Sequence, residues 1–128
     1  FLEAHEVEEK YYYGQDKYNY PELSTSITKK ETFYQWRRVY VRENKSGVCP
    51  TLTANMGTGG HNVPLIKDTF GIRKLTPREC FNLQGFPATF KLPDDVPNTQ
   101  LYKQAGNSVT VAMIERFAEI IHGCLSSD

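Results

Sequence analysis

The chain has 128 residues, 39% of them hydrophobic, so it can form one small domain with one core but not a two-domain enzyme with its own cofactor fold. Its net charge is zero, and it has neither a run of 18 apolar residues nor a charged-then-apolar leader, which predicts a soluble, cytoplasmic protein that does not enter a membrane. It starts with Phe1 rather than methionine, as the tail of a longer chain would.

The charge is unevenly distributed along the chain. Residues 1–22 hold six acidic and two basic side chains, whereas residues 28–47 hold six basic and two acidic ones together with Tyr34, Trp36 and Tyr40. A basic block with aromatic neighbours suits a surface that contacts phosphate, but it also suits a solvated face of a strand. Charge alone leaves both interpretations open.

Short strands are predicted in the first half. Residues 1–13 begin with a helical pattern and lead into a turn-rich linker with Gly14 and Pro21. Residues 33–41, "FYQWRRVYV", have the β-branched and aromatic composition of a strand, and the turn "ENKSG" joins them to a predicted partner strand, "VCPTLTA". If residues 33–41 form one strand, Arg38, Tyr40 and Arg42 lie on one face because the strand period is two.

Helices are predicted in the second half. Thr76 as N-cap, Pro77 at the first helical position, Glu79 in a capping box and Gly85 beyond the end define a short helix. Residues 99–104 form a second helix closed by Gly106. Residues 108–122 form the last helix, with an apolar face that needs a partner. Strands followed by helices indicate an irregular, mixed α+β fold.

Three segments carry a resemblance to a known family: "TLTANMGTGG" at residues 51–60, "RKLTPRECFNLQGFP" at residues 73–87 and "QLYKQAGNSVTV" at residues 100–111. In this order they resemble the C-terminal part of the bacterial cytosine-5 DNA methyltransferases of restriction-modification systems. The first resembles the end of the target-recognition domain, and the others the ninth and tenth motifs. The resemblance covers the chain from about Glu8 onward and implies part of the fold of methyltransferases that use S-adenosylmethionine.

The resemblance divides the chain by role. It implies a target-recognition, DNA-binding region at residues 1–72 and a segment with the ninth and tenth motifs at residues 73–128, whose last helix packs on a catalytic domain not included here. The reaction it implies is methyl transfer from S-adenosyl-L-methionine to carbon 5 of a cytosine flipped out of double-stranded DNA.

The reacting groups of that family belong to upstream motifs, and no catalytic residue is predicted here. Cys49-Pro50 reverses the family's Pro-Cys nucleophile, and Glu43-Asn44 precedes the cysteine instead of following it. The strand-to-helix glycine loop of a cofactor site is absent from the sequence. The three cysteines, Cys49, Cys80 and Cys124, lack metal-ligand spacing and predict reduced thiols, with no metal site and no disulfide framework.

Two groups of site residues follow from the resemblance. Asn107, Ser108 and Val109 would contact the cofactor, with helix capping as the alternative role of Asn107 or Ser108. Thr51 would contact DNA phosphate, and Arg38 and Arg42 would read bases. The main chain of three glycines would lie against the DNA backbone without obstructing side chains: Gly57, Gly59 and Gly60. The alternatives are an ordinary hairpin tip for the glycines, and phosphate or glutamate neutralisation for the arginines.

The expected partners are duplex DNA and the catalytic domain, supplied either by the N-terminal part of the same protein or by a partner subunit. The chain is then a fragment of a methyltransferase or the small subunit of a split one. A third alternative is a sequence-specific DNA-binding module without catalysis.

Overall fold

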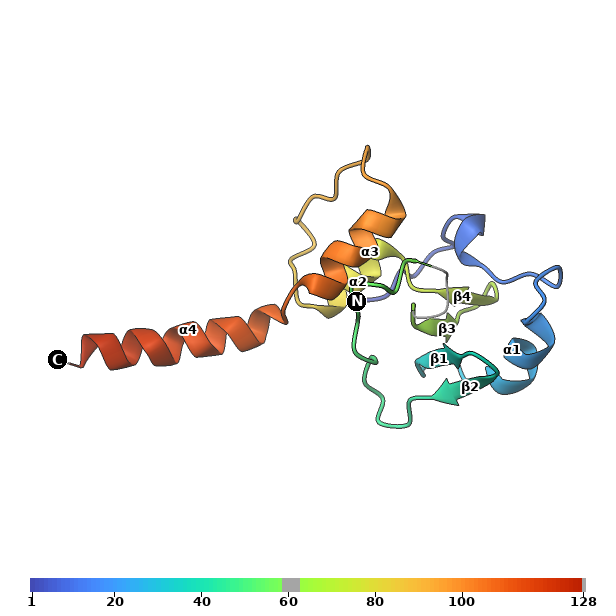
Figure 1. The fold of residues 1–128 in the computed structure, drawn as a ribbon, viewed down its shortest axis with the longest axis horizontal. Coiled ribbons are helices and arrows are strands. Elements are labelled where there is room, and N and C mark those ends of the chain that lie inside the picture. Colours follow the sequence, from blue (N-terminus) through green and yellow to red (C-terminus); the bar gives the residue numbers. More distant parts are fainter. Residues whose placement is uncertain (59–62, 128) are drawn as a thin grey trace.

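In the computed structural model, which describes residues 1–58 and 63–127, a small sheet lies between one short helix and a helical pair (Figure 1). The strands are β1 (Tyr34–Arg37), β2 (Tyr40–Glu43), β3 (Leu65–Lys67) and β4 (Ile72–Lys74). They form one antiparallel sheet in the order β2-β1-β3-β4. With its helices, the sheet gives the α+β architecture that the sequence predicts.

Helices flank the sheet on two sides. A single 3-10 turn, η1 (Glu9–Tyr11), precedes α1 (Tyr20–Ser26), whose Leu23 and the following Ile27 pack on the sheet with Tyr34 and Trp36. The sequence pattern predicted only a linker at α1, although proline near the first helical position is a helix-start signal. On the other side lie α2 (Pro77–Leu83) and α3 (Asn98–Asn107).

The core crosses the predicted boundary between residues 72 and 73. That boundary falls inside β4, and the larger cluster joins Leu52, Met56 and Ile66 to Phe81 and Tyr102 from α2 and α3. The division into a recognition region and a motif segment therefore remains a prediction about roles, because both sides pack in one core.

The predicted capped helix is confirmed in α2. The Thr76 side chain accepts a hydrogen bond from the Glu79 amide, and Glu79 accepts one from the Thr76 amide, which completes the capping box. Gly85, just beyond the helix, has a φ of 89°, a conformation that favours glycine.

Three element boundaries differ from the sequence prediction. The run at residues 33–41 is not one strand: β1 and β2 reverse at Arg38 and Val39, and β2 takes the place of the predicted partner strand. α3 continues through Gly106, which does not close it. α4 (Val111–Ser126) begins three residues later than predicted, because Asn107 ends α3 and residues 108–110 link the two helices.

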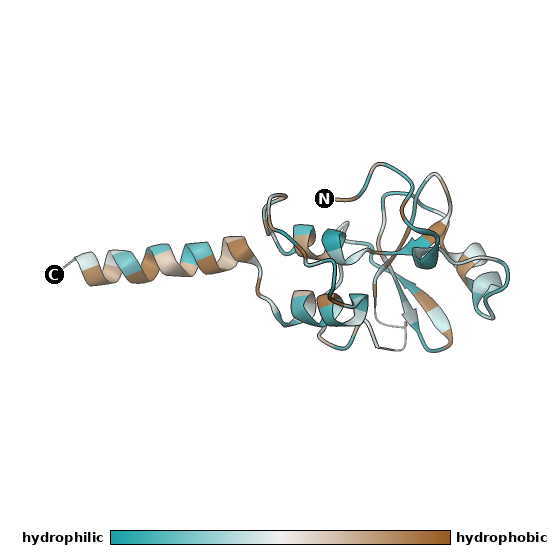
Figure 2. Cartoon of the chain, turned by 90° about the horizontal axis from the view of Figure 1, so that it is seen from above, coloured by the Kyte–Doolittle hydropathy of each residue, from teal (hydrophilic) through white to brown (hydrophobic). Residues whose placement is uncertain are grey.

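The last helix stands apart from the body of the molecule (Figure 1). None of its described residues is buried, and hydrophobic and hydrophilic positions alternate along its ribbon in Figure 2. The spacing of its large exposed apolar residues places them on one side of the helix, as an apolar stripe: Met113, Ile114, Phe117, Ile120, Ile121 and Leu125. The apolar face predicted from the sequence is present, and the described part of the chain does not cover it.

Candidate functional site

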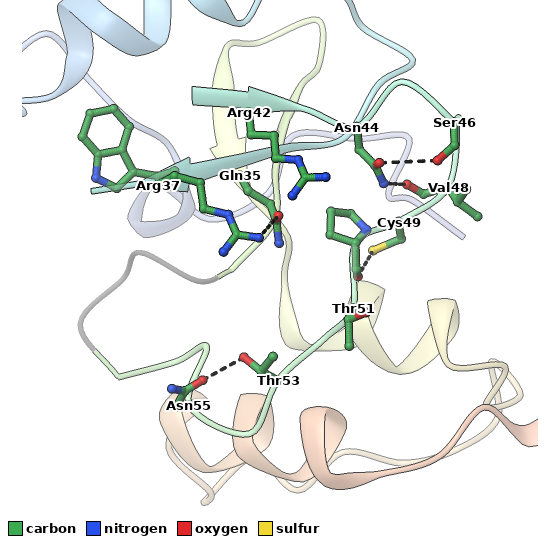
Figure 3. Close-up of a pocket in the computed structure, with 12 residues that line it drawn as sticks. Gln35, Arg37, Arg42, Asn44, Ser46, Val48, Cys49, Thr51, Thr53 and Asn55 are labelled. Atoms are coloured by element: carbon green, nitrogen blue, oxygen red, sulfur yellow. Dashed lines mark hydrogen bonds between the residues drawn. The ribbon is translucent and has the colours of Figure 1, made fainter. Parts of the chain in front are cut away.

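An open groove of about 590 Å³ lies between the β1–β2 hairpin and the segment at residues 44–55 (Figure 3). The hairpin contributes Gln35, Trp36, Arg37 and Arg42 to its lining. The opposite wall contributes polar side chains: Asn44, Ser46, Thr51, Thr53 and Asn55. In Figure 3, Gln35 and Arg42 point from the hairpin toward the wall that carries Thr51.

The hairpin register decides which side chains face the groove. Gln35 pairs with Arg42, and Arg37 pairs with Tyr40. Directly opposed residues of antiparallel strands project to the same side, so Gln35, Arg37 and Arg42 share a face, while Tyr34 is buried on the other. Arg37 and Gln35 are thus groove residues that the sequence analysis missed.

The predicted grouping of Arg38 with Tyr40 and Arg42 on one face is wrong for Arg38. Arg38 lies in the turn with a φ of 57°, and the amide of Val39 donates to the carbonyl of Arg37 at 2.6 Å. A count by twos fails across a turn, and Arg37 takes the position that was predicted for Arg38. Arg38 instead lies at the exposed hairpin tip, outside the groove lining.

Along the opposite wall, buried and exposed side chains alternate as they do in an extended segment. Leu52 is buried in the core, and Thr51, Thr53 and Asn55 are exposed along the groove. The period of two along "TLTAN" was the signal that could have added Thr53 and Asn55 to the predicted Thr51.

The groove is electropositive. Two arginines line it, and its lining, within the residues that the structure describes, includes no Asp or Glu. Glu43, the acidic neighbour in β2, binds Lys29 at 2.7 Å, and this bond raises the pKa of Lys29. Without a carboxylate among them, Arg37 and Arg42 present net positive charge to the groove.

Close packing against α3 explains why residue 57 is a glycine. A Cβ on Gly57 would lie 2.9 Å from the Cβ of Tyr102 in α3. A Cβ on Gly106 would lie 2.2 Å from the carbonyl carbon and oxygen of Thr53. These contacts hold the Thr51 wall against α3, so Gly57 has a packing reason to lack a side chain. Gly59 and Gly60 lie outside the described residues.

The linker between α3 and α4 is anchored by Gln84. The Gln84 side chain donates to the carbonyl of Ala105 at 3.0 Å, and the main-chain carbonyl of Gln84 accepts from the amide of Val111 at 2.8 Å. Ser108 donates to the Ala105 carbonyl at 2.6 Å and thus caps the end of α3 rather than the start of α4. Asn107 and Val109 remain exposed on this fixed backbone.

Cys49 lines the groove but lacks the environment of a nucleophile. Desolvation raises the pKa of its half-buried thiol to about 12, and its Sγ donates to the carbonyl of Pro50 at 3.3 Å. A thiol that stays protonated at neutral pH is a poor nucleophile. Its groove neighbours, among the described residues, include no acidic side chain. That Cys49 is not catalytic stays a prediction.

The reactivity of the thiols tests that interpretation. At pH 8, iodoacetamide should alkylate the exposed Cys124 of the native chain well before Cys49, because alkylation requires the thiolate. Peptide mass spectrometry measures both sites, and unfolding in urea should bring the two rates together. Native labelling of Cys49 as fast as Cys124 would contradict a non-catalytic Cys49.

The described part of the chain has neither a cluster of metal ligands nor a membrane-spanning helix. Within residues 1–58 and 63–127, no three His, Cys, Asp or Glu side chains are grouped as metal ligands. No helix there has both the length and the apolar composition of a membrane span.

Comparison with known proteins identifies related sequences. The family model for C-5 cytosine-specific DNA methylase matches residues 2–123. The chain is 64% identical over 117 residues to the type II methyltransferase M.Bsp6I of Bacillus sp. (strain RFL6), covering 91% of this chain and 37% of that protein. It is 43% identical over 77 residues to the type II methyltransferase M.SsoII of Shigella sonnei, covering 60% of this chain and 20% of that protein.

A phage protein is also similar. The orphan methyltransferase M.Rho11sI of Bacillus phage rho11s is 53% identical over 57 residues, which cover 41% of this chain and 11% of that protein. The chain thus spans well under half the length of each of these three relatives.

Proposed function

The chain belongs to the C-5 cytosine-specific DNA methylase family, and we propose on that premise that it is the C-terminal part of a DNA (cytosine-5-)-methyltransferase of a restriction-modification system. In this role it recognises a specific duplex sequence and completes the cofactor pocket. The catalytic groups come from the N-terminal part of the protein or from a partner subunit. The single observation that carries the proposal is the electropositive groove between the hairpin and the Thr51 wall.

The groove supports DNA recognition by its charge and its donors. Arg42 points into it from β2, and arginine gives the best bidentate contact to guanine in the major groove. Thr51, exposed on the opposite wall, suits a phosphate contact. Arg38 at the exposed hairpin tip and the main chain of Gly57 complete the proposed DNA surface, with phosphate as their target.

The anchored linker supports a role in the cofactor pocket. Its backbone is held by Gln84, while the amide of Asn107 and the apolar side chain of Val109 stay exposed. Asn107, Ser108 and Val109 would hold S-adenosylmethionine, which supplies the methyl group. A polar amide beside an apolar side chain fits a ligand with both polar and apolar parts.

The apolar stripe of α4 supports contact with a catalytic part. Phe117 and Ile121 are 53% and 58% exposed, and exposed apolar faces of this kind mark interaction sites. The match to M.Bsp6I covers only 37% of that protein, so its larger part has no counterpart in this chain. We propose that this larger part contains the surface that covers α4.

Reconstitution tests the proposed function. The chain is mixed with the part of M.Bsp6I outside the match, and transfer of a labelled methyl group from S-adenosylmethionine to duplex DNA is measured. We expect transfer only when both pieces are present. If no transfer can be reconstituted while the chain still binds duplex DNA, the non-catalytic DNA-binding alternative replaces the enzyme.

Arg42→Ala should weaken duplex binding by the reconstituted complex by about 1 to 3 kcal/mol, the range for a base-reading arginine. Fluorescence anisotropy measures the affinity. The matched control is Arg116→Ala, which removes the same charge from the exposed polar side of α4. Equal affinity of the Arg42 variant and the control would remove the groove from the DNA interface.

The cofactor role has its own readout in the same complex. Asn107→Ala should raise the KM for S-adenosylmethionine without lowering the melting temperature, because the side chain is exposed. An unchanged KM would mean that the Asn107 side chain does not contact the cofactor and that Asn107 only ends α3.

A further inference from the structure

The side-chain amides that line the groove use their acceptors within the groove. Arg37 Nη2 donates to Gln35 Oε1 at 3.0 Å, and Thr53 Oγ1 donates to Asn55 Oδ1 at 2.8 Å. Ser46 Oγ donates to Asn44 Oδ1 at 3.4 Å, and the amide nitrogen of Asn44 donates to the Val48 carbonyl. Each of the three side-chain amides that line the groove therefore has one lone pair of its carbonyl oxygen occupied.

The groups that remain open in the groove are donors. A carboxamide whose oxygen is held still has its NH₂ group, so Gln35 and Asn55 each offer donors. Arg42 adds a guanidinium, which has five N–H donors and no acceptor, and no described residue accepts a hydrogen bond from it. The described groove thus offers a ligand mainly donors, and its acceptors are hydroxyls, main-chain carbonyls and the second lone pairs of the amide oxygens.

The hydrogen bond with Arg37 fixes the orientation of the Gln35 carboxamide. Arginine has no acceptor, so only the oxygen of the Gln35 carboxamide can face Arg37, and its nitrogen points away. Glutamine with both groups free pairs with adenine, donating to N7 and accepting from the N6 amino group. Because Arg37 draws the oxygen toward itself and occupies one of its two lone pairs, the group that Gln35 presents away from Arg37 is its NH₂ donor, which favours a base edge with acceptors over the N6 amino group.

We infer that Gln35 and Arg42 together read guanine in this groove, and that Arg37 is the positioning residue that sets this preference by holding the Gln35 oxygen. Guanine presents only acceptors, O6 and N7, in the major groove. Gln35 and Arg42 are direct cross-strand partners, so their side chains start about 5 Å apart on the same face. This spacing lets both reach the same or adjacent base pairs.

The inference rests on the proposed function, because it requires duplex DNA in the groove. The test is selection from a randomised duplex library by the 128-residue chain at low salt, followed by sequencing. The wild-type chain should select guanine over adenine by about tenfold or more at one position at least. Arg37→Met frees the Gln35 oxygen and should lower the preference for guanine over adenine at the position that Gln35 contacts, while Arg42 still favours guanine.

A second variant replaces the hydrogen-bond donor of residue 35 by an acceptor. Gln35→Glu keeps the pairing with Arg37 but turns the other oxygen of the side chain into an acceptor, which suits the amino group of cytosine. Selection should shift from guanine toward cytosine at that position. Arg116→Met, which removes an arginine of α4 outside the groove, should leave the selected sequence unchanged.

The outcomes separate the two proposals. If Arg37→Met binds all sequences more weakly and keeps the guanine preference, Arg37 only neutralises phosphate, and this inference fails while the proposed function stands. If the wild-type chain selects a sequence without guanine, the inference also fails. If the chain alone binds no duplex, the selection uses the reconstituted complex, and absence of duplex binding by that complex overturns both proposals together.

Discussion

Replacing Arg73 by methionine should lower the free energy of unfolding by about 3 to 5 kcal/mol, a large part of the stability of a domain of this size. The Arg73 side chain is fully buried and binds both oxygens of Glu79 at 2.8 Å, and its Nε lies 2.6 Å from Oδ2 of Asp68. Glu79 is itself fully buried. Without Arg73, its carboxylate would be an uncompensated charge in the core.

Denaturant unfolding followed by circular dichroism measures this loss. The matched control is Arg116→Met, which breaks an exposed arginine–glutamate pair and should change stability little. Arg73→Met combined with Glu79→Gln should recover part of the loss, because a neutral amide can still accept from the Thr76 amide. Equal stability of Arg73→Met and Arg116→Met would contradict the buried ion pair.

The same pair predicts a dependence on pH. Burial alone would raise the pKa of Glu79, but hydrogen bonds from Arg73 and from the amides of Glu3 and Thr76 outweigh it and hold the pKa below its usual range. A depressed carboxyl pKa contributes stability above about pH 4, the value in the unfolded chain, and that stability is lost as the pH falls through the folded-state pKa. In Arg73→Met this loss on acidification should disappear, because burial then dominates and raises the pKa.

The sequence predicted α2 correctly because its signals are local. Thr76, Pro77, Glu79 and Gly85 each act on a backbone group within one turn of the helix, so no tertiary information is needed. The sequence could not show that Glu79 also binds the buried Arg73, since that contact depends on how the chain turns from β4 into α2. Glu79, which the sequence assigns to the helix cap, is therefore also the partner of the buried charge of Arg73.

The hairpin turn was missed because it lacks the usual turn residues. Arg38 and Val39 replace the Asn, Asp or Gly that two-residue hairpins favour, whereas the stretch after β2 contains Asn44 and Gly47 and drew the turn prediction. The basic composition of the hairpin could be predicted from the sequence. Which arginine faces the groove could not, because that depends on where the two-residue turn lies.

Gly106 was predicted to end a helix because glycine often does so, but close packing accounts for it here. α3 continues to Asn107, and the face that carries Gly106 lies against the backbone of Thr53 and Ala54. Sequence patterns cannot separate a glycine that ends a helix from one that lets another segment approach. The distinction matters for the groove, since Thr53 belongs to its wall.

Gly106→Ala should destabilise the chain by about 3 kcal/mol and displace the Thr51 wall, although alanine is the better helix former. The added Cβ would lie 2.2 Å from Thr53 backbone atoms and 2.5 Å from the Ala54 amide nitrogen. Because these neighbours are backbone, no flexible side chain can move aside. The melting temperature should fall by roughly 10 °C, and duplex binding should weaken as the groove wall moves.

The matched control is Gly123→Ala in α4, near the end of a helix like Gly106, where the added Cβ would have no atom within 4 Å apart from its chain neighbours and the nearby backbone of its own helix. It should raise stability by less than about 1 kcal/mol, the helix-propensity gain alone. Thermal unfolding compares the two variants directly, and opposite signs are expected. If both variants stabilise the chain, α3 does not press on Thr53, and the support for the groove wall would have to come from Gly57 and Tyr102 alone.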